Sequence, residues 1–90
     1  MDETDLRLDG NALAGPLGEI FAWEMTTAVG TCAGCGAVGE LARLVVYERG
    51  PGAVARCPAC GAVVLRVVRT EGRVWLDARG ARSLELRTDR

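Results

Sequence analysis

Four cysteines stand in two pairs of the same spacing, CAGCG at 32–36 and CPACG at 57–61. Two residues between thiols let a tight turn direct both sulfur atoms at one point about 2.3 Å away, the Zn–S distance of a tetrahedral thiolate site. The glycine after each pair can adopt a positive φ and turn the chain back, and Pro58 presets the second turn. This pattern predicts one metal ion bound by four thiolates. The predicted ligands are Cys32, Cys35, Cys57 and Cys60.

Other roles for paired thiols fit the sequence less well. A single CxxC also occurs in redox and haem-attachment motifs, but two copies with 21 residues between the pairs favour a metal site. A thioredoxin-like redox pair requires a helix that begins at the motif, whereas strand-forming residues follow both pairs here. A free Cys also packs as a small apolar side chain, and this remains the structural alternative.

The residues before the cysteines predict an amphipathic helix over about 11–26. Its apolar positions follow helical spacing and are Leu13, Leu17, Ile20, Phe21 and Met25. Pro16 is accommodated best in the first turn of a helix, so we expect the regular helix to begin there, with Gly15 or Asn11 as the cap. Residues 1–10 are acidic and polar, which predicts a flexible terminus.

After Gly30 the pattern changes to short strands separated by glycine-containing turns. The predicted strands are 41–48, 53–56, 62–69, 73–77 and about 83–87. Both faces of strand 62–69 are mostly apolar, so both need cover. The helix can cover one face, and the other is left to a second layer of strands or to another subunit.

The fold predicted from these elements is a small α+β domain over 11–90, in which antiparallel β-hairpins carry two CxxCG knuckles after an amino-terminal amphipathic helix. The cysteine motifs resemble zinc-ribbon and rubredoxin-like knuckles over about residues 31–77. The whole chain, with LDGNALAG, CAGCG, CPACG and RVWLD, resembles a family of short uncharacterised bacterial zinc-ribbon proteins. That resemblance implies a metal-binding ribbon and no known activity.

The ion that four cysteines bind is either zinc or iron. Rubredoxin-like electron carriers, to which the motifs are similar, pack several aromatic side chains around an iron centre, whereas only Tyr47 and Trp75 are expected near this one. We therefore favour Zn²⁺, with Fe as the alternative. Four protein ligands leave no open position for water or substrate, so the predicted site is structural rather than catalytic.

Composition and charge limit the cellular location and the kinds of partner that we expect. No segment approaches the roughly 20 apolar residues of a membrane span, and the acidic amino end does not resemble a secretory signal, so we expect a cytoplasmic protein with reduced thiols. Residues 1–40 hold seven acidic residues and one Arg, whereas residues 41–90 hold five acidic residues and ten Arg. This Arg bias indicates either a functional surface or a GC-rich coding sequence.

No catalytic set is evident, because the chain has no His and neither Thr26-Thr27 nor Ser83 has an evident base beside it. Glu19 and Glu24 are interpreted as the solvated face of the helix. We therefore expect a non-enzyme that acts as a protein-interaction or accessory module, with an exposed Trp23 as the sign of a protein partner.

The first alternative function is nucleic-acid binding, in which guanidinium groups contact phosphates and Trp75 or Tyr47 stacks on bases. The arginines that this would use are Arg43, Arg49, Arg56, Arg66, Arg69, Arg73, Arg79, Arg82 and Arg87. The acidic helix half and a net charge of −1 oppose a polyanion, so this function is not favoured. One-electron transfer by an iron centre is the other alternative.

Overall fold

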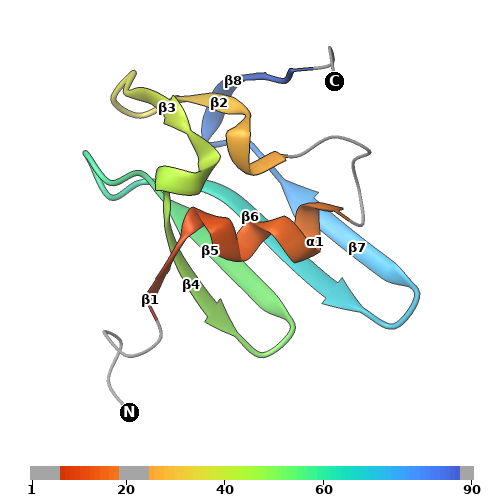
Figure 1. The fold of residues 1–90 in the computed structure, drawn as a ribbon. Coiled ribbons are helices and arrows are strands. Elements are labelled where there is room, and N and C mark those ends of the chain that lie inside the picture. The colour runs from red at the N-terminus through yellow and green to blue at the C-terminus, as the bar shows by residue number, and fades with distance from the viewer. Residues whose placement is uncertain (1–6, 19–24, 88–90) are drawn as a thin grey trace.

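The structure is a computed structural model that describes residues 7–18 and 25–87. Within these ranges the chain forms two antiparallel sheets with a short helical segment near the amino end (Figure 1). The five-stranded sheet has the order β1-β4-β5-β6-β7 and the three-stranded sheet the order β3-β2-β8. The strands are β1 (Arg7–Asp9), β2 (Val29–Cys32), β3 (Val38–Glu40), β4 (Val45–Arg49), β5 (Gly52–Arg56), β6 (Val63–Thr70), β7 (Arg73–Asp77) and β8 (Ala81–Glu85). The predicted combination of an amino-terminal helix with antiparallel strands is confirmed at this level.

The helical segment is shorter and more broken than the predicted helix over 11–26. A 3-10 helix (Gly10–Leu13) leads directly into α1 (Ala14–Gly18), and a second 3-10 helix covers Met25–Thr27. Pro16 lies inside α1 rather than at its start. The remainder of the predicted helix, residues 19–24, lies outside the described residues, and with it the question of whether Trp23 is exposed.

The cap of this segment is Asp9, so the predicted caps Gly15 and Asn11 are wrong. The Asp9 carboxylate accepts a hydrogen bond of 3.0 Å from the backbone N–H of Asn11. An aspartate just before the first turn satisfies an N–H group that has no partner within the helix. The cap lies earlier than predicted because the helical segment begins as a 3-10 turn at Gly10.

The sequence predicts a flexible terminus over residues 1–10, but residues 7–9 form a strand, and residues 1–6 lie outside the described residues. Residues 7–9 form β1, which pairs antiparallel with β4 so that Leu8 lies opposite Val46. Gly10 follows β1 and is buried against the short 3-10 helix Leu41–Arg43 that precedes β4. The amino-terminal segment is therefore attached to the sheet from Arg7 onward.

The core lies between α1 and one face of the five-stranded sheet, and α1 crosses this sheet in front of β5 and β6 in Figure 1. Leu13 and Leu17 are buried completely or nearly so. Strand alternation places the buried sheet residues on the face toward the helix. These sheet residues are Val46, Ala53, Ala55, Leu65 and Val67.

A bulge explains the long apolar run in β6. Leu65 lies opposite Ala55, but Val63 lies opposite Arg56, so Val64 is an extra residue in this strand. A bulge of this kind interrupts the alternation, and Val64 and Leu65 are accordingly both buried. The outer face of β6 after the bulge carries Arg66 and the partly exposed Val68. The prediction that this strand is apolar on both faces therefore does not hold beyond Leu65.

The later strands lie close to their predicted positions. β7 covers the predicted 73–77, and β8 covers Ala81–Glu85 where 83–87 was expected. β2 and β3 flank the first cysteine turn and have no counterpart among the predicted strands. No helix in residues 7–18 or 25–87 combines the length and the apolar character that crossing a membrane requires.

Candidate metal centre

The first cysteine turn connects β2 to β3. The backbone N–H of Cys32 donates to the carbonyl of Ala37 at 2.9 Å, and the N–H of Gly36 donates to the carbonyl of Cys32 at 2.9 Å. Gly36 has a φ of 80°, a conformation that side chains with a Cβ rarely adopt. The glycine after the cysteine pair therefore closes the turn, as its position in the sequence predicts.

The second cysteine turn connects β5 to β6 and repeats the same hydrogen bonds. The N–H of Cys57 donates to the carbonyl of Ala62 at 2.8 Å, and the N–H of Gly61 donates to the carbonyl of Cys57 at 2.8 Å. Gly61 has a φ of 79°. The two turns belong to different sheets, so their sulfur atoms meet only because the sheets pack against each other.

The four sulfur atoms form one cluster, and all lie within 4.8 Å of one another. The Sγ atoms of Cys32 and Cys60 are 3.7 Å apart, and those of Cys35 and Cys57 are also 3.7 Å apart. A tetrahedron with Zn–S bonds of about 2.3 Å has S···S edges of about 3.8 Å. All four cysteines are free of disulfides. The cluster therefore has the size of a tetrathiolate metal site, which brings together the four ligands that the sequence predicts.

Backbone N–H groups point at the sulfur atoms. In the second turn, Ala59 donates to the Sγ of Cys57 at 3.4 Å, and Ala62 donates to the Sγ of Cys60 at 3.5 Å. Such hydrogen bonds disperse part of the negative charge of a thiolate and orient the ligand. The second turn therefore places backbone N–H groups where they can contact metal-bound sulfur atoms.

The two thiols of the first turn have pKa values shifted in opposite directions. Backbone N–H groups of Cys35 and Gly34 lower the pKa of Cys32 to about 7, because they stabilise the thiolate. The N–H of Ala37 acts in the same direction on Cys35, but desolvation and the other thiols outweigh it and raise the pKa of Cys35 to about 11. Backbone N–H groups likewise lower the pKa of Cys57. For all four cysteines to be thiolates at once, a cation must balance their charge, and a divalent metal ion would supply it.

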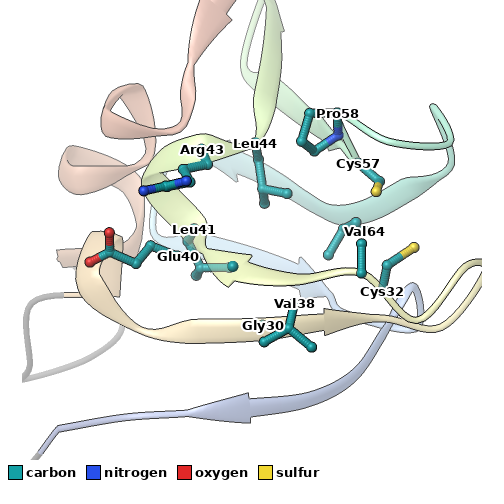
Figure 2. A pocket seen from close by; sticks show the side chains of 12 residues that line it. Gly30, Cys32, Val38, Glu40, Leu41, Arg43, Leu44, Cys57, Pro58 and Val64 are labelled. Atoms are coloured by element: carbon teal, nitrogen blue, oxygen red, sulfur yellow. The ribbon is translucent and has the colours of Figure 1, made fainter.

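The cluster lies partly at the surface, beside an apolar cavity of about 190 Å³. Cys32 and Cys57 are buried, whereas Cys35 and Cys60 are exposed. Figure 2 shows Cys32 and Cys57 at one end of the cavity and Glu40 and Arg43 at the other. The apolar side chains around it include Val38, Leu41, Leu44, Pro58 and Val64. Sequence reasoning missed this cavity because it arises where the two sheets meet.

Ser83 and Thr26, which the sequence analysis considered as catalytic candidates, lie in contacts within the fold. The Oγ of Ser83 on β8 donates to the Oγ1 of Thr31 on β2 at 3.3 Å, which links two neighbouring strands. Thr26 is buried within the 3-10 helix Met25–Thr27. Glu19 and Glu24 lie outside the described residues.

Comparison with known protein families gives a match that spans residues 2–89 of the chain. The matching family is described as "Family of unknown function (DUF6510)". A search of curated proteins and a search of solved structures each returned no match.

Proposed function

Since the chain belongs to DUF6510, a family of unknown function, we propose its role from its own residues: it is a small non-catalytic protein built around one structural zinc ion. Its fold would then be a zinc ribbon with two CxxCG knuckles. The observation that carries this proposal is the convergence of four thiols from turns in two different sheets. An ion held by Cys32, Cys35, Cys57 and Cys60 would crosslink the two sheets.

Zinc is proposed over iron on the surroundings of the thiols. Within residues 7–18 and 25–87, no aromatic residue lines the cavity beside Cys32 and Cys57. Trp75 lies on β7, at the opposite edge of the five-stranded sheet from β1. Four thiolate ligands also fill a tetrahedral zinc site, so the ion would support the fold and offer no position to a substrate.

Elemental analysis of the protein purified without added metal tests this proposal. We expect one zinc per chain and a colourless solution. An Ala59→Ser variant is a matched control, because it changes an exposed non-ligand residue between two ligands and should keep the zinc. A red protein with one iron per chain would overturn the zinc assignment in favour of an electron carrier.

For its biological role we propose a protein-interaction or accessory module. The first part of the helical segment does not provide the contact surface, because Leu13 and Leu17 are buried in the core. Apolar side chains elsewhere support the proposal. Val38 beside the cavity is 68% exposed and Trp75 on β7 is 52% exposed.

Nucleic-acid binding is the second candidate function, and the outer face of the five-stranded sheet favours it. The register aligns Tyr47, Val54 and Arg66 in one row across three strands, and Trp75 and Val68 are paired in the next row. An open sheet face with aromatic and guanidinium groups is a surface on which single-stranded nucleic acid can stack and pair.

A salt-dependent binding assay with a single-stranded oligonucleotide tests this second candidate. If it holds, Trp75→Ala and Arg66→Ala should each weaken binding by about tenfold, since stacking of one base contributes about 1–3 kcal/mol. Arg82→Ala, on β8 in the other sheet, is the matched control and should change binding little. Absence of binding at low salt would eliminate this candidate.

A further inference from the structure

β7 forms one edge of the five-stranded sheet, with β6 as its only neighbour among the described strands. The backbone N–H of Arg69 donates to the carbonyl of Pro51 at 2.9 Å, on the β5 side of β6. The backbone N–H and C=O of Arg69 therefore point away from β7. Val74, which lies opposite Arg69 on β7, accordingly makes no backbone hydrogen bond to β6. By alternation, Val74 and Leu76 both direct their N–H and C=O groups outward from the edge of the sheet.

The side chains of β7 are apolar in the middle of the strand and oppositely charged at its ends, in the order RVWLD. Val74 is 38% exposed and Trp75 is 52% exposed. Edge strands of monomeric proteins are usually protected by central charges, proline or a bulge. β7 has none of these devices between Arg73 and Asp77, so this edge, unpaired among the described strands, is suited to pairing with another strand.

We propose that this edge pairs with the β7 edge of a second copy of the chain, antiparallel and centred on Trp75, to form a symmetric dimer. In this register Arg73 lies opposite Asp77 of the second copy, and Val74 lies opposite Leu76. Two opposite-charge pairs form, because Arg73 of each copy faces Asp77 of the other. The two five-stranded sheets become one continuous sheet.

The backbone supports the same register. With Trp75 opposite Trp75 of the second copy, Val74 and the facing Leu76 form a hydrogen-bonded pair on each side of the axis, which satisfies all the outward N–H and C=O groups of these residues. The two Trp75 residues then occupy a non-hydrogen-bonded position, where facing side chains are closest. An aromatic pair at such a position stabilises the association of strands.

Electrostatics favour this dimer over a parallel or shifted pairing. Asp77 lies opposite Arg66 on β6 and forms an ion pair of 2.7 Å with Arg79. Hydrogen bonds from Arg79 lower the pKa of Asp77 to about 2, so the carboxylate stays charged at neutral pH. Arg73 of the second copy would add a further guanidinium to this carboxylate. No cysteine takes part, so the dimer does not depend on the identity of the metal.

Sedimentation equilibrium of the full metal-loaded chain from micromolar to millimolar concentration tests the dimer. We expect a reversible monomer–dimer equilibrium. Val74→Pro removes an outward N–H group without breaking a β6–β7 hydrogen bond, and it should leave the chain monomeric, whereas the control Val74→Thr should still dimerise. Unfolding curves and metal content of the same samples show whether each variant is folded.

A charge exchange gives a second test that does not depend on proline. Arg73→Asp and Asp77→Lys each place like charges opposite one another in the dimer, so each variant alone should dimerise about tenfold more weakly or worse. An equimolar mixture of the two restores both opposite-charge pairs and should form a heterodimer.

Three results on self-association would overturn the proposal. They are a wild-type chain that stays monomeric at millimolar concentration, a folded Val74→Pro variant that dimerises like the wild type, and a mixture of the charge variants that associates no better than either alone. A fourth is a monomeric Trp23→Phe variant whose remaining tryptophan, Trp75, changes its fluorescence when an oligonucleotide is added, which would assign this side of the sheet to nucleic acid.

Discussion

Cys57→Ser is expected to abolish cooperative thermal unfolding and metal retention together. Cys57 is buried in the turn between β5 and β6, and its Sγ lies 3.7 Å from that of Cys35 in the other turn. Binding of structural zinc contributes about 10–16 kcal/mol in peptides. A small domain has a total stability of about 5–15 kcal/mol. Loss of the binding free energy of the ion is therefore expected to leave the folded state unstable. Calorimetry or circular dichroism with temperature measures this loss.

Chelation of the wild-type protein should have the same effect, because the exposed Cys35 and Cys60 leave one side of the site open to a chelator. The effect should reverse on addition of zinc. The control Ala59→Ser shows whether any substitution in this turn destabilises the protein. We expect this variant to melt like the wild type. A metal-free protein with a native-like cooperative transition would show that the packing of the two sheets alone holds the fold, and that the ion is dispensable.

Gly10→Ala is expected to destabilise the protein by about 3 kcal/mol or more. Gly10 lies at the junction of β1 and the helical segment, directly against the backbone of the 3-10 helix Leu41–Arg43. A Cβ there would overlap the carbonyl oxygen of Leu41 and come within 2.8 Å of the carbonyl carbon of Ala42. Backbone atoms cannot rotate away as a side chain can, so β1 or α1 would have to move. Denaturant unfolding measures the change.

Gly18→Ala is the matched control for this close approach. Gly18 is the exposed last residue of α1, and a Cβ there would have no neighbouring atom within 4 Å. Alanine reduces the entropy of the unfolded chain and favours the helix, so this variant should be more stable by up to about 1 kcal/mol. Equal effects of the two substitutions would show that glycine flexibility, rather than the contact with Leu41, is what position 10 requires.

The features that the sequence predicts well are local ones. The spacing within CAGCG and CPACG determines how two thiols converge, and the glycine after each pair adopts the positive φ that its position predicts. The position of β7 follows from the short turn Glu71-Gly72 and the strand-forming residues beside it. In both cases the information lies within a few residues of the element.

The features that sequence reasoning missed depend on contacts between distant segments. β1 is a strand because Arg7–Asp9 pairs with β4, some 36 to 40 residues later in the register. The bulge at Val64 arises from pairing with β5 and changes which β6 side chains face the core. The assignment of the two cysteine turns to different sheets is of the same kind. No periodicity within a short window carries such information.

The bulge and the second cysteine turn lie close together, and both bear on which side chains of β6 face the core. Val64 follows closely after Cys60, so a metal ion bound at Cys60 would hold the start of β6 in place, while the extra residue determines which side chains beyond it face inward. A change of one residue in the length of the chain between Cys60 and Leu65 would turn Arg66 toward α1 and Leu65 toward water. An ion bound by these cysteines would fix where β6 begins, and the bulge determines which of its side chains face the core.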